Sequence, residues 1–165
     1  MSRKLDFRIR PFEARDAAAF AALNHRWIDE LFMLEEKDIS QLQHPQSTIL
    51  DKGGFIAIAE ASGWVVGTGA ILPAAQAPDD GRKWFEVVKM TTDLSAQRMG
   101  VGSAILSRLI EFARENGAHA IWLETNSALE AAALLYEKSG FARLQGDQMW
   151  PSPYERCNLQ MTMIL

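Results

Sequence analysis

The hydrophobic residues of this chain follow a period of two in several short stretches, which is the pattern of half-buried β-strands. Two of these stretches are separated only by Ala61-Ser62-Gly63, a short glycine-containing loop that predicts a β-hairpin. The predicted strands are residues 7–10, 55–60, 64–72, 84–92, 119–125, 141–144 and 157–163. The polar stretches 35–52, 73–82 and 146–155 predict surface loops, the first with one helical turn at 39–42.

A period near 3.6 residues marks the helices between these strands. The sequence predicts helices over residues 17–23, 24–34 and 101–115, and from an N-cap at Ser127 to a stop at Gly140. Asp16 is expected to cap the first helix, and Asn116-Gly117 to end the third. Helices that alternate with strands, with hairpins on either side, predict a mixed α/β sheet in one domain over residues 1–165.

The segment Gln97-Arg98-Met99-Gly100-Val101-Gly102 joins the strand 84–92 to the helix 101–115. A strand that turns through glycines into a helix aims several backbone N–H groups at one point, where the helix dipole adds positive charge. This arrangement predicts a phosphorylated ligand. A dinucleotide fingerprint would need a third glycine at Ile105, and a P-loop would need Gly-Lys-Ser/Thr, which the chain lacks. The alternative is an ordinary strand-to-helix turn that binds nothing.

The composition argues against several kinds of partner and cofactor. With a net charge of −4 and no lysine or arginine block, the chain is not expected to bind nucleic acid. Cys157 is the single cysteine and lies in an alternating pattern, so we expect a buried, unreactive thiol. The three histidines, His25, His44 and His119, lack metal-ligand spacing, so no metal is expected. The absence of a signal-peptide pattern or an apolar run of about 20 residues predicts a cytoplasmic protein that does not bind membranes.

Two motifs, each in a strand-to-helix context, carry a family resemblance. Gln97 to Gly102 matches Gln/Arg-x-x-Gly-x-Gly/Ala, and residues 135–141 match Leu-Tyr-x-x-x-Gly-Phe. With these motifs the chain resembles the GNAT (GCN5-related N-acetyltransferase) family over essentially its whole length, most specifically from Trp84 to Phe141. It departs at Leu129, where many members carry an asparagine seven residues before the tyrosine. The nearest asparagine is Asn126.

The resemblance implies a GNAT-like fold and acetyl-CoA as cofactor. The fold would be a mixed, mostly antiparallel sheet of six to seven strands with about four helices, in which two splayed strands hold acetyl-CoA. The pyrophosphate would lie on the glycine turn and the pantetheine along the central strand. The cofactor-binding residues that this implies are Met90, Thr91, Thr92, Gln97, Arg98, Met99, Gly100, Val101, Gly102, Ser103 and Asn126.

The resemblance also implies acetyl transfer by direct attack of a primary amine, which requires a base for the ammonium and an acid for the thiolate. The family's usual acid maps onto Tyr136, whose alternative is a helix tyrosine packed on the sheet. For the base, Glu86 on the central strand is the first candidate and Glu124 the second, and a water chain without a single base is the third option. A β-bulge in the central strand would re-aim Glu86.

The acceptor would be a small molecule, an amino acid or a peptide, held by the first two helices and the loop before the last strand. The residues this nominates are Trp27, Glu30, Phe32, Glu35, Trp150 and Tyr154. Acidic and aromatic side chains together would suit a cationic amine, although each could equally be a packing residue. Two rival functions stay open: a non-catalytic acyl-CoA sensor, and a transferase of longer acyl groups. A homodimer is also left open.

Overall fold

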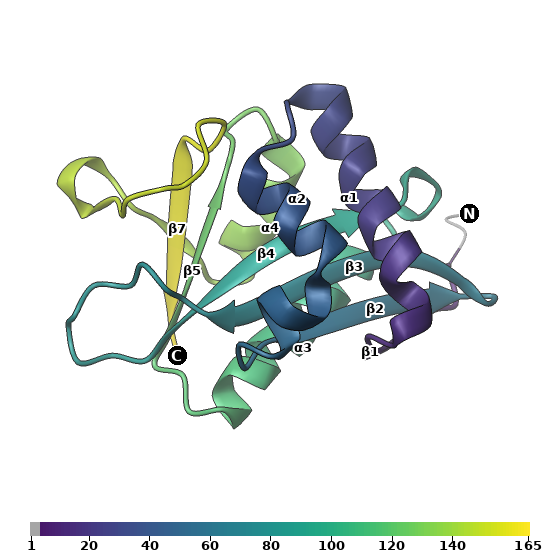
Figure 1. The fold of residues 1–165 in the computed structure, drawn as a ribbon, viewed down its shortest axis with the longest axis horizontal. Helices are drawn as coiled ribbons and strands as arrows, with labels where there is room; N and C mark the ends of the chain where they lie inside the picture. Colours follow the sequence, from purple (N-terminus) through teal and green to yellow (C-terminus); the bar gives the residue numbers. More distant parts are fainter. Residues whose placement is uncertain (1–3) are drawn as a thin grey trace.

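The computed structural model describes residues 4–165, apart from the side chains of Glu30 and Leu31. Its centre is a seven-stranded sheet in the order β1-β2-β3-β4-β5-β7-β6 (Figure 1). The strands are β1 (Arg8–Pro11), β2 (Phe55–Ala61), β3 (Trp64–Pro73), β4 (Trp84–Thr92), β5 (Ala120–Thr125), β6 (Ala142–Arg143) and β7 (Leu159–Ile164). All neighbouring strands pair antiparallel except β4 and β5, which are parallel. The predicted mixed, mostly antiparallel sheet is confirmed.

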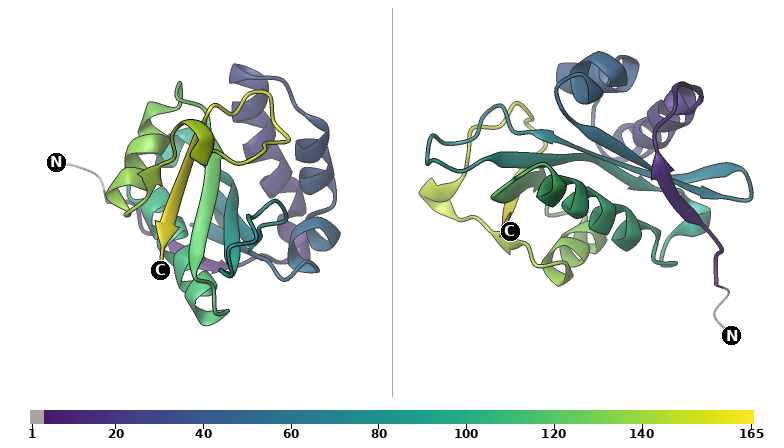
Figure 2. Two further views of the ribbon diagram at one scale, coloured as in Figure 1. Left: turned by 90° about the vertical axis from the view of Figure 1, so that its left-hand side faces the viewer. Right: turned by 90° about the horizontal axis from the view of Figure 1, so that it is seen from below.

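Helices cover both faces of this sheet (Figures 1 and 2). They are α1 (Ala17–Leu31), α2 (Glu36–Gln43), α3 (Val101–Glu115) and α4 (Glu130–Lys138). On one face α1 and α2 close a core that includes Phe20, Leu42 and Ile58. On the other face α3 and α4 pack over the larger core, in which Ile105 and Leu109 are fully buried. Both faces of the sheet are therefore covered by helices, and the strands carry apolar residues on both faces.

The helical part between β1 and β2 differs from the prediction. The stretch predicted as two helices is one continuous α1 that ends at Leu31, and the stretch predicted as a loop contains α2 and a π-helix, η2 (Gln46–Leu50). Glu35 and Asp38 form a capping box that starts α2. The inner side of α2 is partly polar, with Asp38 and Gln41 buried beside Leu42. Those polar residues hide the apolar period from which a helix would be predicted.

The start of α4 and the position of Cys157 also need correction. The N-cap of α4 is Leu129, because Ser127 and Asn126 are used in the turn before it: the Ser127 N–H donates to Asn158 Oδ1 (2.8 Å), and the Ala128 N–H donates to Asn126 Oδ1 (2.8 Å). Cys157 lies before β7, which starts at Leu159, and its thiol is half-buried. Burial raises the pKa of this thiol to about 12, so it stays protonated near neutral pH.

A β-bulge in β4 changes which way its side chains point. Ala70 pairs with Val88 but Thr68 pairs with Thr91, so β4 contains one extra residue there. Lys89 takes up the irregularity with a φ of 55°, in the left-handed region. As a result Val88 and Lys89 both face the side of α1 and α2, where Val88 packs against the core and Lys89 meets Asp38.

The parallel strands β4 and β5 separate in their second halves. They pair from Trp84↔Ala120 to Val87↔Leu123 and no further, although β4 runs on to Thr92 and β5 to Thr125. This leaves the edge of β4 beyond Val87 unpaired on its β5 side. The splay of two central strands implied by the family resemblance is therefore present.

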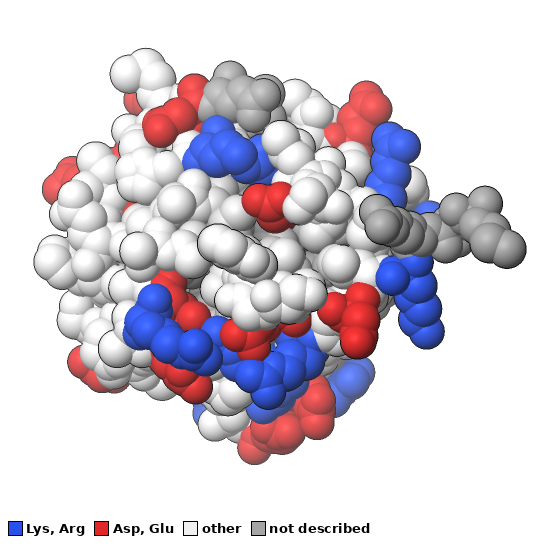
Figure 3. All heavy atoms as spheres, turned by 90° about the vertical axis from the view of Figure 1, so that its right-hand side faces the viewer, with Lys and Arg blue, Asp and Glu red and all other residues white. Residues whose placement is uncertain are grey.

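Charges are mixed on the surface drawn in Figure 3. Lysine and arginine side chains alternate there with aspartate and glutamate, and the described residues of that face form no extended basic surface of the kind that nucleic acids bind. Within residues 4–165, none of the helices has the length and apolar character required to cross a membrane.

Candidate active site

A pocket of about 80 Å³ lies where β4 and β5 separate. Its walls come from both sides of the sheet. The lining residues are 86–90 of β4, 123–126 at the end of β5, the N-cap Leu129 with Ala132 and Tyr136 of α4, Trp27 and Phe32 at the end of α1, and Tyr154, Arg156 and Cys157 before β7. Segments far apart in the sequence thus converge on the splay, where a ligand could lie between the two strands.

The glycine turn begins α3 close to the end of β4. Gly100 is the N-cap of α3 and has a φ of 83°, and a Cβ built on it would meet nothing within 4 Å. The first turn of α3 therefore starts from an open, left-handed residue with its N–H groups directed outward. A Cβ on Gly102 would lie 3.2 Å from Leu135 of α4 and 3.7 Å from Thr92 Oγ1. The turn, the end of β4 and α4 are consequently neighbours.

Tyr136 reaches this pocket from α4 and is 6% exposed. Its ring meets Phe141 edge-to-face, with 6.0 Å between the centroids. Burial raises the pKa of its hydroxyl above the ordinary value for tyrosine. The hydroxyl therefore stays protonated at neutral pH and is available as a proton donor.

Two carboxylates in the pocket differ in their surroundings. Glu86 is 3% exposed and has polar neighbours, with Lys37 Nζ 3.7 Å and Gln76 Nε2 3.5 Å from its oxygens. Burial raises its pKa, and the charge of Lys37 opposes that shift. Glu124 has a buried Oε2 without a hydrogen-bond partner. Burial raises the pKa of Glu124 to about 7, a hydrogen bond with Ser152 opposes the shift, and the charge of Glu86 adds to it.

These surroundings favour Glu124 over Glu86 as a base. A base works best when its pKa lies near the working pH and its lone pairs are free to accept a proton. Glu124 meets both conditions, whereas one oxygen of Glu86 lies beside Lys37 and the other accepts from Gln76. These local surroundings differ from the order in which the sequence ranked the two carboxylates, and the identity of the base stays a prediction.

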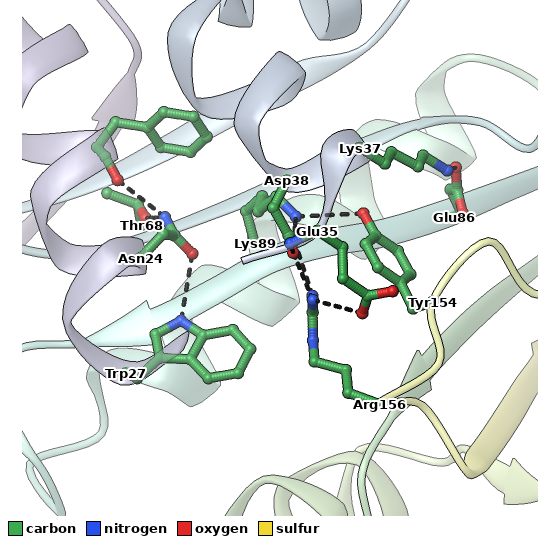
Figure 4. Close-up of polar contacts among 11 residues, drawn as sticks. Asn24, Trp27, Glu35, Lys37, Asp38, Thr68, Glu86, Lys89, Tyr154 and Arg156 are labelled. Atoms are coloured by element: carbon green, nitrogen blue, oxygen red, sulfur yellow. Dashed lines mark hydrogen bonds and ion pairs between the residues drawn. The ribbon is translucent and has the colours of Figure 1, made fainter. Parts of the chain in front are cut away.

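An ion-pair cluster forms the side of the site nearest α2 (Figure 4). Asp38 is fully buried and receives Lys89 Nζ at 2.5 Å and Arg156 Nη2 at 2.8 Å. Arg156 Nη1 donates to Asp38 as well and to Glu35 Oε2 at 3.1 Å. Burial alone would raise the pKa of Asp38, but the hydrogen bonds from Arg156 and the charge of Lys89 lower it below its ordinary value. Asp38 is therefore an anion that holds two cations.

Aromatic side chains form a further part of the pocket wall and contact the same cluster, with the Arg156 guanidinium 5.8 Å from the ring centroid of Trp27. Trp27 and Phe32 meet edge-to-face with centroids 6.3 Å apart. Asn24 fixes the indole, because its Oδ1 accepts from Trp27 Nε1 (3.4 Å) while its Nδ2 donates to the Phe20 carbonyl (2.9 Å; Figure 4). Tyr154 completes the wall and lies beneath the Arg156 guanidinium, 4.4 Å from the ring centroid.

Comparison with known proteins identifies the family of this chain. Residues 18–141 match the model of the acetyltransferase (GNAT) family. This chain belongs to the GNAT family. Its sequence is 29% identical to N-acetyltransferase 8 of Rattus norvegicus over 98 residues, which are 59% of this chain and 44% of that protein. With N-acetyltransferase 8B of the same species the identity is 30% over 107 residues, 65% of this chain and 47% of that protein. The chain thus spans less than half the length of these relatives.

Solved structures of the GNAT family share the fold. A GNAT acetyltransferase from Staphylococcus aureus MU50 superimposes with a TM-score of 0.84 at 16% identity, covering 96% of this chain and 99% of that one. A Salmonella typhimurium protein, solved with its cofactor acetyl-CoA, gives a TM-score of 0.74 at 23% identity, covering 96% and 94%. The GNAT-like fold expected from the two motifs is confirmed.

The residues expected at a GNAT site fall into three groups. Glu86, Met90, Asn126, Tyr136, Trp27, Phe32 and Tyr154 line the pocket. Glu35, Thr91, Thr92 and residues 97–103 are not among its lining residues, and Gly102 lies beside Thr92 and Leu135. Trp150 does not reach the pocket, because it stacks on Trp122 at 4.7 Å and meets Trp84 edge-on at 4.8 Å. The side chain of Glu30 lies outside the described residues. Their roles in binding and catalysis remain predictions.

Asn126 and the ion-pair cluster are the notable differences from those expectations. Asn126 lines the pocket, but its Nδ2 donates to the Arg156 carbonyl at 2.5 Å and its Oδ1 accepts from Ala128, so its side chain holds the turn after β5. The cluster of Asp38, Lys89 and Arg156 went unpredicted. Its only sequence signal was a lysine inside an apolar strand, and nothing in the pattern identified Asp38 as the partner.

The described residues contain no group of three or more histidine, cysteine, aspartate and glutamate side chains arranged to hold a metal ion.

Proposed function

We propose that this protein is an acetyl-CoA-dependent N-acetyltransferase that moves the acetyl group to a primary amine. The observation that carries the proposal is the convergence of three features on the splay between β4 and β5: the glycine turn of α3, the buried hydroxyl of Tyr136 and the free oxygen of Glu124. Membership of the GNAT family and the names of the relatives support it.

The residues present fit acetyl-CoA. The unpaired β4 edge beyond Val87 offers backbone groups to an extended pantetheine arm, as an added strand would use them. Gly100 leaves space next to the first N–H groups of α3, and Gln97 and Arg98 are exposed beside it, so that a pyrophosphate finds both a helix N-terminus and polar side chains. The related Salmonella protein with acetyl-CoA supports this cofactor.

Two proton transfers are assigned to residues of this chain. A bound acetyl-CoA supplies the acetyl group as a thioester, the form from which an amine can displace a thiolate. A lysine-like ammonium has a pKa near 10.4, so only about one molecule in 10³ is neutral at pH 7. We assign the removal of that proton to Glu124, which is partly ionised there and has a free oxygen. Tyr136 donates a proton to the sulfur, whose thiol has an ordinary pKa near 8.5.

A screen of primary amines with acetyl-CoA tests this proposal. The purified protein should release CoA with at least one amine, and longer acyl-CoAs in parallel reactions would reveal a different acyl preference. Tight binding of acetyl-CoA without turnover by any amine would instead support the sensor function. Failure to bind acetyl-CoA at all would overturn the proposal.

Replacing Gly100 with valine should weaken acetyl-CoA binding at least about tenfold. A valine at a φ of 83° is strained, and its side chain would occupy the open space in front of the N–H groups of α3. Isothermal titration calorimetry with acetyl-CoA measures the change.

The matched control is Gly117→Val, at the other end of α3. Gly117 has a φ of 73° and equally open surroundings, so the substitution introduces a similar strain away from the cofactor. Equal losses of affinity in both variants would show that strain alone is responsible and would remove the glycine turn from the cofactor site.

A further inference from the structure

The cations on the acceptor side of the site already have carboxylate partners. Three charged groups lie over the ring of Tyr154: Lys37 at 5.7 Å, Lys89 at 5.3 Å and Arg156 at 4.4 Å from the centroid. Lys37 pairs with Glu86, Lys89 pairs with Asp38, and Arg156 pairs with both Asp38 and Glu35 (Figure 4). A substrate carboxylate would have to compete for each of them.

Among the described charged side chains that line the pocket or pair with its lining residues, one acid is left over. Asp38 and Glu35 balance Lys89 and Arg156, and Glu86 balances Lys37. Glu124 remains, with its Oε2 buried and without a partner. The missing complement is therefore a single positive charge, such as a substrate ammonium. A carboxylate on the carbon next to that ammonium would find that Lys37, Lys89 and Arg156, the cations over Tyr154, are each already paired with an acid of the chain.

The part of the pocket wall that comes from the end of α1 is aromatic. Trp27 and Phe32 line it, and Met33, the residue after Phe32, is 84% exposed at the end of α1. Aromatic faces bind both apolar groups and ammonium groups. The body of a bound amine would consequently contact aromatic rings, while its nitrogen pointed at the carboxylate of Glu124.

We infer that the acceptor is a primary amine on an apolar body without a neighbouring carboxylate, an arylalkylamine in chemical class, and that Glu35 contributes to this specificity by supplying the second negative charge that balances Lys89 and Arg156. The inference rests on the proposed N-acetyltransferase function. Arg156 lines the pocket and is the cation best suited to receive a carboxylate, because its guanidinium can bind one through two hydrogen bonds. Asp38 already accepts hydrogen bonds from both terminal nitrogens of Arg156, and Glu35 accepts one from Nη1.

Three acceptors of matched size separate charge from shape: phenethylamine, phenylalaninamide and phenylalanine. The measurement is kcat/KM with acetyl-CoA, corrected for the neutral-amine fraction of each acceptor. Phenethylamine and phenylalaninamide should react, and phenylalanine should be at least about tenfold slower, because an unpaired charge in a partly buried site loses at least the value of one charge-assisted hydrogen bond. Phenylalanine within twofold of phenylalaninamide would overturn the inference.

Glu35→Gln tests the specificity role in the same assay. The amide keeps an oxygen for the Glu155 N–H, which now donates to Glu35 Oε1 at 2.9 Å, and for the cap of α2. It removes the negative charge that faces Arg156, so Glu35, Asp38, Lys89 and Arg156 together change from neutral to a net charge of about +1. The ratio of kcat/KM for phenylalanine to that for phenethylamine should rise about tenfold.

The control is Glu36→Gln, which changes the charge of the protein equally at an exposed neighbouring position. Its ratio should match that of the unmodified protein. An unchanged ratio in Glu35→Gln, or the same rise in both variants, would overturn the role of Glu35. A protein that binds acetyl-CoA but acetylates none of the three acceptors would overturn the acceptor class alone, whereas a protein that does not bind acetyl-CoA would overturn the proposed function itself.

Discussion

Glu124→Gln is expected to lower kcat/KM at pH 7 by about 10²–10³-fold, within the range that a general base contributes. Glutamine keeps the shape of the side chain but cannot take a proton from the acceptor ammonium. Because the carboxylate is the active form, activity of the unmodified protein should rise with pH through about 7, where Glu124 loses its proton. This rise should be absent from the pH profile of the variant.

Glu86→Gln provides the matched comparison in the same pocket. The charge of Glu86 is one cause of the raised pKa of Glu124, so removing that charge should move the rise in kcat/KM to lower pH. Most of the maximal rate should persist. If Glu86→Gln abolished activity and Glu124→Gln left it intact, Glu86 would be the base, as the sequence first suggested. Full activity in both variants would favour a chain of water molecules.

Tyr136→Phe should lower kcat by about 10²-fold while leaving the affinity for acetyl-CoA nearly unchanged. The phenylalanine ring keeps the buried contact with Phe141, but the proton donor for the thiolate is gone. Since burial raises the pKa of Tyr136 above its ordinary value, its hydroxyl should not produce a fall in activity between pH 7 and about 10. Steady-state kinetics with acetyl-CoA and calorimetry of its binding separate the two effects.

Tyr154→Phe is the natural control, because it removes the second tyrosine hydroxyl from the same pocket. That hydroxyl accepts a hydrogen bond from Lys89 Nζ at 3.3 Å and belongs to the wall of the site. We expect a loss of less than about tenfold in kcat, since no proton transfer is assigned to it. A loss in Tyr136→Phe that appeared only in KM would indicate a binding role for the hydroxyl, and full kcat would leave Tyr136 as a packing residue.

Features built from neighbouring residues were predictable. The turn at Gln97–Gly102 and the helix after it follow from a local glycine pattern and a regular apolar period, and both are present. The hairpin between β2 and β3 was recognised from its turn, where Ser62 and Gly63 take φ values of 50° and 79°. Such elements depend on local backbone preferences and on periodicity, which the sequence displays directly.

Features that combine distant residues do not follow from the sequence pattern, and a β-bulge in β4 was considered only because the family resemblance suggested it. The extra residue in β4 follows from its register against β3, and that register has no mark in the strand's own apolar run. In the sequence Lys89 is only a polar residue within that apolar run. In the folded chain the bulge directs its side chain toward Asp38, 51 positions away in the sequence. Trp150 shows the opposite error: an aromatic residue in the expected loop packs into a separate cluster with Trp84 and Trp122.

The sequence by itself determined the family, the position of the glycine turn and the helix that carries Tyr136, because contiguous residues form each of them. Only the tertiary structure distinguishes the surroundings of the two carboxylates, on which the proposed choice of Glu124 as base depends. A pKa depends on burial and on nearby charges, and for Glu124 these come from Ser152 and Glu86, which other segments of the chain supply. The pairing of Arg156 with Glu35 and Asp38, and hence the charge that the acceptor meets, likewise exists only after the chain has folded.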